Sequence, residues 1–551
     1  MTILHPIITD ACYFLVVVVA VVQCSSHNNF NDPFGKHHSM KTFPSPYGCN
    51  RSLGISFPSI SLPIIYSTEL NVSSTFYISN EQVMVTWPAT YSSCDDDFIG
   101  IYFIDIPLLI GACDYFDYEF IQTNQTIMSW QMINLHRPLE FRYYSRDKNC
   151  SGNYSLMAKS AIVQSFNYNA PEQIHLAYGD QIDHMFVSYV TNSSEYVSEC
   201  QYELGPSSLQ RRVQGTTITY KASDMCNGQA NIPGPKSFID PGFIHTIIFE
   251  DIRPATTYFY RVGNEQHGWS SVLSFTNRPA DDYNAKVLLI AYGDMGVAPT
   301  QPGAKSTVDR VQAQVLTNNI TCILHIGDIS YARGGDKDLS GAPGPGSFRP
   351  LGNYGNDSGG ECAVPMVRRF HSPSNGNVLF WDSFDMGPVH IVYYSTEHDF
   401  LPSSTQHTWL EHDLSSINRT FTPWLIVGSQ RPMYSSIVRV VGDPIKGMLR
   451  KSLELMFYQY HVDINLFAYI HSYERSCPMY QEQCVDDEIT HALIGMAGHN
   501  LDFDTYTEAK WSLYHDQQFG YTQISDNRTH LHYSNHRNVD DAVVDHFDLT
   551  K

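Results

Sequence analysis

Positive charge is scarce in this sequence. Its 551 residues include 34 Lys and Arg against 56 Asp and Glu, which gives a formal net charge of -22. Nucleic acids and anionic membranes repel such a chain, so we expect neither as its main partner. A phosphorylated small molecule would need a local source of positive charge, and a bound metal ion supplies one.

Long hydrophobic runs are also missing, apart from residues 13–22. That run is shorter than the roughly 20 apolar residues that cross a bilayer, so we expect no stable membrane span. We interpret residues 1–25 as a secretory signal, although no Lys or Arg precedes the run. Ten Asn-X-Ser/Thr sequons support export to the outside or to a lysosome- or vacuole-like compartment. They are Asn50, Asn71, Asn124, Asn149, Asn153, Asn192, Asn319, Asn356, Asn418 and Asn527.

The chain contains 12 cysteines, of which two lie in the interpreted signal region. The remaining ten are an even number, which is compatible with disulfides in an oxidising compartment. Cys477 and Cys484 flank a short turn, and we expect this pair to be bonded.

A chain of this length exceeds one hydrophobic core, so several domains are expected. Residues 26–168 and 169–279 show short β-like runs between clusters of Ser, Asn, Gly and Pro, with no long helical period. This spacing predicts two β-sandwich modules. The second resembles a fibronectin type III domain, with Tyr258 or Tyr260 packing inward.

From about residue 280 strands alternate with helices. Residues 287–331 form one β-α-β pattern in which both apolar strands end in Gly-Asp. The strands of such a unit are parallel and usually adjacent, so Asp294 and Asp328 should emerge side by side at their carboxyl ends. Tyr331 follows closely and can turn back to the same point. Two carboxylates and a phenol outline a site for a hard metal ion.

Four later apolar runs also end in polar residues. These residues are Glu397 and His398, then Gln430, then Tyr469 and His471, then His499 and Asn500. The repetition predicts one sheet with functional residues along one edge. His325 lies within an apolar strand and is interpreted as a core histidine, whereas His398 and His499 are interpreted as supporting or structural residues.

Several motifs together resemble one family. They are GDMG at 293–296, GDISYARG at 327–334, GNDSGGEC at 355–362, STEHDF, RPMY, HSYER around His471, and GMAGHN. In order and spacing they resemble a large purple acid phosphatase of the calcineurin-like metallophosphoesterase superfamily. The resemblance implies β-sandwich modules followed by an α/β (βαβαβ) metallophosphoesterase domain. Its parts would be a first β module (26–168), a fibronectin III-like N-terminal domain (169–279), the catalytic domain (280–500) and a C-terminal segment (501–551).

The resemblance also implies an acid phosphatase that hydrolyses small phosphomonoesters with metal-bound hydroxide. Fe(III) would occupy one position, with Zn, Mn or Fe(II) beside it, and inorganic phosphate would also bind. A homodimer is compatible with the family. The first metal keeps all its ligands here, namely Asp294, the bridging Asp328, Tyr331 and His471.

The second metal loses its expected ligands. Gln430 stands where the family has the His of VxxH, and Tyr469 stands where it has the first His of GHxH. The GNH(D/E) motif is absent, because the chain has an internal deletion near residues 334–336. Gln430 and Tyr469 remain weak candidate ligands, and His398 is the weak candidate for a catalytic role.

Three hypotheses follow. The chain is a secreted phosphatase impaired by its altered second-metal ligands. Alternatively, it is a non-catalytic glycoprotein with one metal or none and a binding role. The third hypothesis is a truncated splice or gene-model product of an active enzyme, which accounts for the deletion but not for Gln430 or Tyr469.

Overall fold

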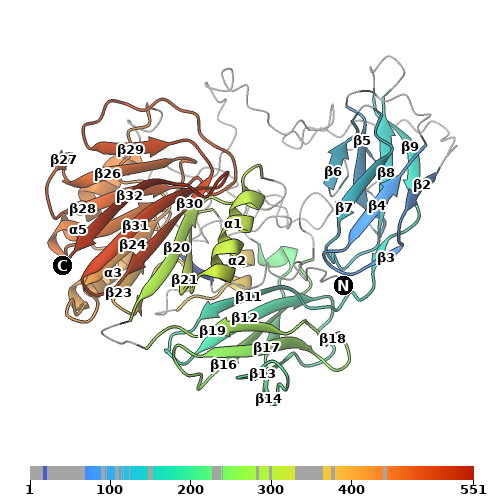
Figure 1. Cartoon of the computed structure of the whole chain (residues 1–551), viewed down its shortest axis with the longest axis horizontal. Helices are drawn as coiled ribbons and strands as arrows, with labels where there is room; N and C mark the ends of the chain where they lie inside the picture. Colours follow the sequence, from blue (N-terminus) through green and yellow to red (C-terminus); the bar gives the residue numbers. More distant parts are fainter. Residues whose placement is uncertain are drawn as a thin grey trace, which may run out of the picture.

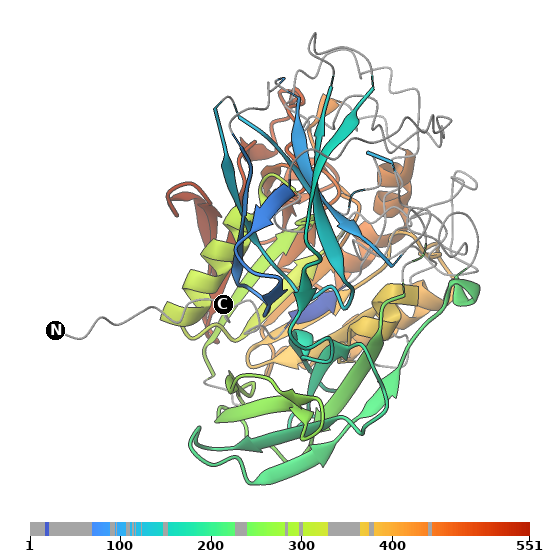
Figure 2. The same cartoon turned by 90° about the vertical axis from the view of Figure 1, so that its right-hand side faces the viewer.

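The computed structural model describes the backbone of residues 17–20 and 69 and, with side chains, residues 70–88, 94, 96–105, 111–112, 115, 117–122, 124–146, 153–225, 238, 240–280, 285–296, 301–328, 364–373, 379–438 and 444–551. Tyr331 and the motif at 355–362 lie outside the described residues. The described elements form two β modules and a larger α/β domain, with the second module below the other two parts in Figures 1 and 2.

The described residues of the first β module form nine short strands. They are β2 (Glu69–Val72), β3 (Phe76–Tyr77), β4 (Gln82–Thr86), β5 (Phe98–Phe103), β6 (Asp117–Phe120), β7 (Ile127–Gln131), β8 (Leu139–Ser145), β9 (Ser155–Ser160) and β10 (Gln164–Ser165). Seven of them pair in the order β6-β5-β8-β9-β2-β4-β7. Val85 on β4 and Phe141 on β8 belong to one buried cluster, so the two halves of this sheet pack on each other. The expected sandwich-like arrangement is therefore present.

The second β module is a two-sheet sandwich. Its elements are β11 (Glu172–Tyr178), β12 (Met185–Thr191), β13 (Glu199–Glu203), β14 (Arg211–Gln214), β15 (Thr216–Ile218), η2 (Ala222–Asp224), β16 (Phe243–Phe249), β17 (Thr257–Asn264), β18 (Gly268–Trp269) and β19 (Leu273–Thr276). One sheet has the order β11-β12-β16-β15 and the other β14-β13-β17-β18, with β19 also on β17. Tyr258 and Tyr260 are both buried between the sheets, as expected.

The α/β domain contains a six-stranded and an eight-stranded sheet. The first has the order β1 (Val17–Ala20), β21 (Cys322–Ile326), β20 (Val287–Gly293), β30 (Gly520–Asp526), β31 (His530–Arg537) and β32 (Val543–Thr550). The second has the order β22 (Asp382–Met386), β23 (Val389–Tyr393), β24 (Trp424–Ser429), β25 (Ile464–Phe467), β28 (Ile489–Ile494), β26 (Tyr473–Tyr480) and β27 (Gln483–Cys484), with β29 (Ser512–Asp516) also on β26. The helices are α1 (Ala304–Thr317), α2 (Val364–Arg369), α3 (Thr405–Ser416), α4 (Pro444–Leu449), the π-helical η5 (Arg450–Glu454) and α5 (Leu455–Gln459).

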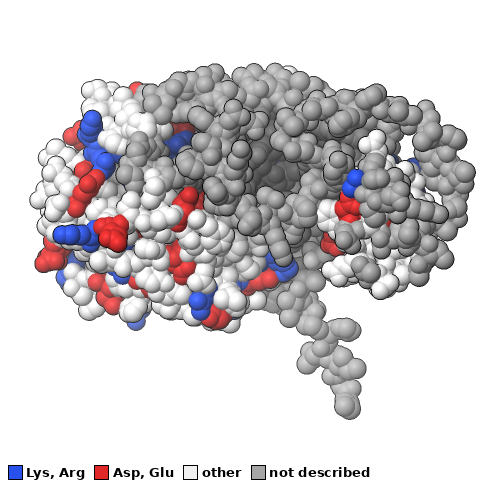
Figure 3. Space-filling model, turned by 90° about the horizontal axis from the view of Figure 1, so that it is seen from above, with Lys and Arg blue, Asp and Glu red and all other residues white. Residues whose placement is uncertain are grey.

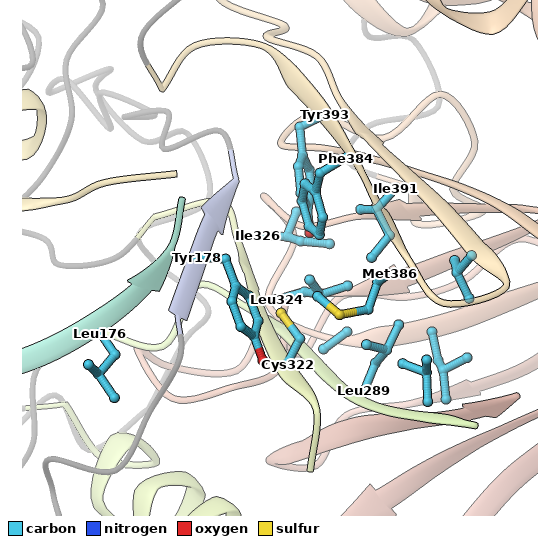
Figure 4. Packing of buried hydrophobic residues seen from close by; sticks show 14 of the residues in the cluster. Leu176, Tyr178, Leu289, Cys322, Leu324, Ile326, Phe384, Met386, Ile391 and Tyr393 are labelled. Atoms are coloured by element: carbon cyan, nitrogen blue, oxygen red, sulfur yellow. The ribbon is translucent and has the colours of Figure 1, made fainter. Parts of the chain in front are cut away.

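The two sheets pack face to face. Leu289 and Leu324 of the six-stranded sheet share a buried cluster with Met386 and Ile391 of the other, and Figure 4 shows these side chains meeting. Helix α1 packs on the outer face of the first sheet through Val311, while α3, α4 and α5 cover the outer face of the second. The four later apolar runs do share one sheet, as expected, because β23, β24, β25 and β28 pair in parallel as neighbours. β20 and β21, which carry Asp294 and Asp328, belong instead to the facing sheet.

The C-terminal strands close the six-stranded sheet, since β30 pairs antiparallel with β20. At the opposite edge, β1 pairs parallel with β21. β1 comes from the apolar run interpreted as part of a signal. No helix among the described residues is long and apolar enough to cross a membrane.

The cysteines follow the expectation only in part. Cys477 and Cys484 form the expected disulfide across the β26–β27 turn, and Cys94 is also disulfide-bonded. Cys200 is a buried free thiol, so the ten cysteines are not all paired. It lies within β13, where a buried thiol packs as a small hydrophobic group.

Six of the sequon asparagines are exposed, namely Asn71, Asn124, Asn153, Asn192, Asn319 and Asn418. Asn527 is partly buried, and its side-chain oxygen accepts hydrogen bonds within a turn. Asn50, Asn149 and Asn356 lie outside the described residues. The described surface seen in Figure 3 carries interspersed charges of both signs.

Candidate metal centre

Asp294 and Asp328 follow β20 and β21, which are adjacent parallel strands. The Asp328 backbone N–H donates to Asp294 Oδ1 over 3.0 Å, so the two residues lie side by side as the β-α-β pattern predicts. Their side chains are 0% and 1% exposed. Two carboxylates buried so completely need cations or hydrogen-bond donors around them.

The glycine before Asp328 allows the close packing of this centre. Gly327 has φ +82°, and a Cβ built there would lie 2.1 Å from Gln430 Oε1 and 2.7 Å from Asp294 Oδ1. Asp294 and Tyr469 also have positive φ, at 55° and 74°. Backbone strain of this kind often gathers at functional sites, where the surrounding structure holds it in place.

The facing sheet supplies the other candidate residues. Gln430 follows β24, and its Nε2 donates to Asp328 Oδ1 over 3.4 Å. Its Oε1 is buried and has no hydrogen-bond partner among the described residues. The amide nitrogen is therefore the Gln430 atom that faces the carboxylates, which places a neutral donor where a metal ligand is expected.

Tyr469 follows β25 and contacts Asp294 through its backbone. Its N–H donates to Asp294 Oδ2. Its ring packs against the buried cluster under α3 to α5 and lies 4.5 Å below the guanidinium of Arg431. Glu397 in turn binds Arg431 through two hydrogen bonds. The phenol is thus held in a packing role.

His471 is oriented by residues that follow β28. Its Nδ1 lies 2.9 Å from Asn500 Oδ1, and its backbone N–H donates to Asp502 Oδ2 over 3.0 Å. Because an amide oxygen only accepts, the proton sits on Nδ1, and Nε2 is the ring atom able to ligate a metal. The His499 ring packs against His471, with centroids 5.0 Å apart.

Burial raises the pKa of Asp294 to about 6, although the His471 imidazole and hydrogen bonds from neighbouring groups act in the opposite direction. Burial is the largest cause because it disfavours the charged carboxylate. A cation bound here would favour the ionised form and release a proton on binding.

Two other histidines, His398 and His325, have hydrogen-bond partners other than the side-chain carboxylates of Asp294 and Asp328. His398 bonds Ser395 Oγ through Nδ1 at 2.8 Å and packs against Phe380 and Trp381, and burial lowers its pKa to about 4. His325 packs against Tyr292, and its Nε2 lies 3.2 Å from the backbone oxygen of Asp328. The buried His325 supports the loop that carries Asp328.

The residue types at this centre suit the first of the two expected metals but not the second. Asp294, Asp328 and His471 offer oxygen and imidazole donors, which are ligand types that suit a first metal such as iron. Their ligand atoms do not all lie within 4.8 Å of one another, so these side chains would have to move closer together to hold it. Gln430 presents an N–H, and Tyr469 presents its backbone, so the second metal does not fit the residues present. Sequence reasoning passed over Asp502 and the orienting role of Asn500. Asn500 is the last residue of the GMAGHN motif and Asp502 lies two residues beyond it, so this motif was the available signal.

The chain has carboxylates and an imidazole at the strand ends of two packed sheets, and two β modules precede these sheets in the sequence. These features place it among the multidomain metallophosphoesterases. A family model described as "Purple acid Phosphatase, N-terminal domain" matches residues 171–277. A second, described as "Iron/zinc purple acid phosphatase-like protein C", matches residues 489–546. The chain belongs to the purple acid phosphatase family.

The relatives named here include plant and animal proteins. "Probable inactive purple acid phosphatase 27" of Arabidopsis thaliana is 30% identical over 455 residues, covering 74% of this chain and 73% of the relative. Human "Acid phosphatase type 7" is 29% identical over 409 residues, covering 66% and 86%. The structure of a purple acid phosphatase from yellow lupin (Lupinus luteus) seeds matches with a TM-score of 0.76 at 24% identity, covering 88% and 96%. This last likeness concerns the fold.

Proposed function

We propose that this chain binds phosphomonoesters at a centre with one metal and hydrolyses them far more slowly than a complete two-metal centre would. The observation that carries the proposal is the Gln430 amide, whose N–H points at Asp328 Oδ1. A bridging carboxylate that accepts this hydrogen bond from the protein is less available to a second cation.

Asp294, Asp328 and His471 would hold the metal, and Tyr331, outside the described residues, is the expected fourth ligand. Iron bound there would supply a Lewis acid for a phosphate oxygen. The chain's own groups prepare this position: Asn500 fixes the His471 tautomer, and two backbone N–H groups hold the Asp294 oxygens. Such supporting contacts tune a metal ligand strongly.

The hypothesis of an efficient phosphatase is weakened by the second metal, whose expected ligands are altered. Efficient in-line displacement in two-metal sites depends on both ions stabilising the attacking and leaving oxygens. The relative from Arabidopsis that matches most of the chain is itself described as probable inactive. Binding of a small phosphorylated molecule or of inorganic phosphate, with little turnover, is the function we infer. The sequons and the disulfide favour an extracellular or vacuole-like location for it.

The test combines metal analysis with turnover. Purified full-length protein is supplied with iron and with zinc or manganese, and metal content and p-nitrophenyl phosphate hydrolysis are measured from acid to neutral pH. We expect about one iron per chain, measurable phosphate binding and hydrolysis near background. Two tightly bound metals together with ready hydrolysis would overturn the proposal.

A paired variant sharpens this test. Gln430→His with Tyr469→His restores two imidazoles and should raise the second metal's affinity, whereas Gln430→Asn keeps an amide and should not.

The truncation hypothesis is tested separately, by sequencing the transcript across residues 333–336. Recovery of a GNH(D/E) segment there would favour an active parent enzyme over the chain described here.

A further inference from the structure

Strand β21 needs a partner on its outer edge. All five of its residues, Cys322–Ile326, are buried. Its inner edge pairs with β20. Buried backbone N–H and C=O groups that lack partners are costly, and a parallel strand of this kind is rarely left at an open edge.

The structure fills that edge with β1. Val17, Val18, Val19 and Ala20 pair in parallel with Ile323, Leu324, His325 and Ile326. The same four β21 residues pair with β20 on the other side. β21 therefore has a paired strand on each side along most of its length, as far as Ile326, which lies two residues before Asp328.

The second β module encloses the same region. Figure 4 shows β1 between β11 and β21, and the β11 residues Leu176 and Tyr178 share a buried cluster with Leu324. The Tyr178 hydroxyl donates to the Thr321 backbone oxygen over 2.8 Å, next to the start of β21. The position of β1 thus lies in the interior between two domains and suits an apolar strand.

We propose that residues 17–20 remain in the folded protein as the edge strand of the six-stranded sheet. The same apolar run can direct export, because a signal must be read but need not be removed. Cleavage after residue 25 would remove the described partner of β21 on its outer edge. Retention of the run gives the strand that carries Asp328 a partner on both sides. This inference concerns the architecture and does not depend on the proposed function.

The first test is the N-terminus of the exported full chain, measured by intact mass after enzymatic deglycosylation. We expect residues 17–20 to be present, and limited proteolysis of the native protein should spare them. An N-terminus beyond residue 20 overturns the proposal, whether the protein is then a monomer or a dimer paired through β21. Rapid native cleavage within residues 13–22 overturns it as well.

Hydrogen exchange gives the second test. In the full chain, Val18→Pro removes a backbone N–H that the parallel ladder can use, so amides in Cys322–Ile326 should exchange roughly tenfold faster. Val18→Ile keeps the N–H and the branched side chain and should leave exchange unchanged, as should α3 in both variants. Equal exchange at β21 in Val18→Pro and wild type contradicts the proposal. If Val18→Pro does not accumulate, the N-terminus and proteolysis of the wild type still decide.

Discussion

Gln430 turns its nitrogen, and not its oxygen, toward Asp328. The Nε2 atom donates to Asp328 Oδ1 over 3.4 Å, while Oε1 is buried without a hydrogen-bond partner in the described part of the chain. A metal ion at this place would require the amide to rotate, since only its oxygen is a ligand. At the position where the resemblance predicts a metal ligand, Gln430 thus provides a hydrogen bond to a carboxylate.

Removing this donor should destabilise the metal-free protein. In Gln430→Leu, Asp328 loses a hydrogen bond in a buried site, which costs about 1–3 kcal/mol of the free energy of unfolding. Urea unfolding with a chelator present measures the change. Gln430→Glu should lose similar stability in chelator but regain it with added manganese, because a third carboxylate attracts a cation. A Leu variant as stable as wild type would contradict this account.

Asn500 should control iron affinity through His471. Asn500→Leu removes the oxygen that holds Nδ1–H, and metal affinity should fall roughly 10- to 100-fold, as for other supporting contacts around metal ligands. Iron titration followed by absorbance measures the affinity. Asn500→Asp retains an acceptor oxygen and should stay much closer to wild type. Equal affinities in the Leu and Asp variants would show that this contact is not used.

Gly327 should tolerate no side chain. A Cβ would lie 2.1 Å from Gln430 Oε1 and 2.6 Å from Ala468 Cβ, in a backbone with φ +82°. Gly327→Ala should therefore lower the free energy of unfolding by about 2–4 kcal/mol. Gly447→Ala is the matched control, because it lies in helix α4 with open space around its Cβ position. That variant should be neutral or more stable by up to about 1 kcal/mol in the same urea measurement.

His390 should make stability depend on pH. Burial alone would lower its pKa, but hydrogen bonds to Asp385 at 2.6 Å and Asp413 at 3.1 Å raise it from 6.5 to about 9. Since the folded-state pKa is the higher one, the stabilisation is fully present below pH 6.5 and is lost as pH rises through 9.

His390→Gln should remove this dependence, with a difference from wild type of at most about 3 kcal/mol at the acid end. Urea midpoints measured from about pH 6 to about pH 9 report it. His532→Gln is the control, because the His532–Asp548 pair is exposed and such pairs contribute little. Parallel pH profiles for wild type and His390→Gln would rule the mechanism out.

Some features of the centre could be predicted from sequence because they are local. Asp294 and Asp328 each end an apolar strand of one β-α-β unit, and the pairing of β20 with β21 brings them together. The turn between Cys477 and Cys484 is short enough to indicate their disulfide. Contacts that depend on distant elements were missed: Asp502 accepts a hydrogen bond from the His471 backbone N–H, and β25 and β28, the strands that precede these two residues, are parallel neighbours.

The sequence by itself predicted that Asp294 and Asp328 lie side by side, because residue type and strand order carry that information. Through the family resemblance it also predicted altered ligands for a second metal. Only the tertiary structure decided that Gln430 and His471 come from a second sheet, since apolar runs do not encode which sheet a strand joins. It also decided that the Tyr469 ring packs against the cluster under α3 to α5 and that Val17–Ala20 pairs with β21. These outcomes depend on long-range packing, which fills buried edges and faces with whatever segment of the chain reaches them.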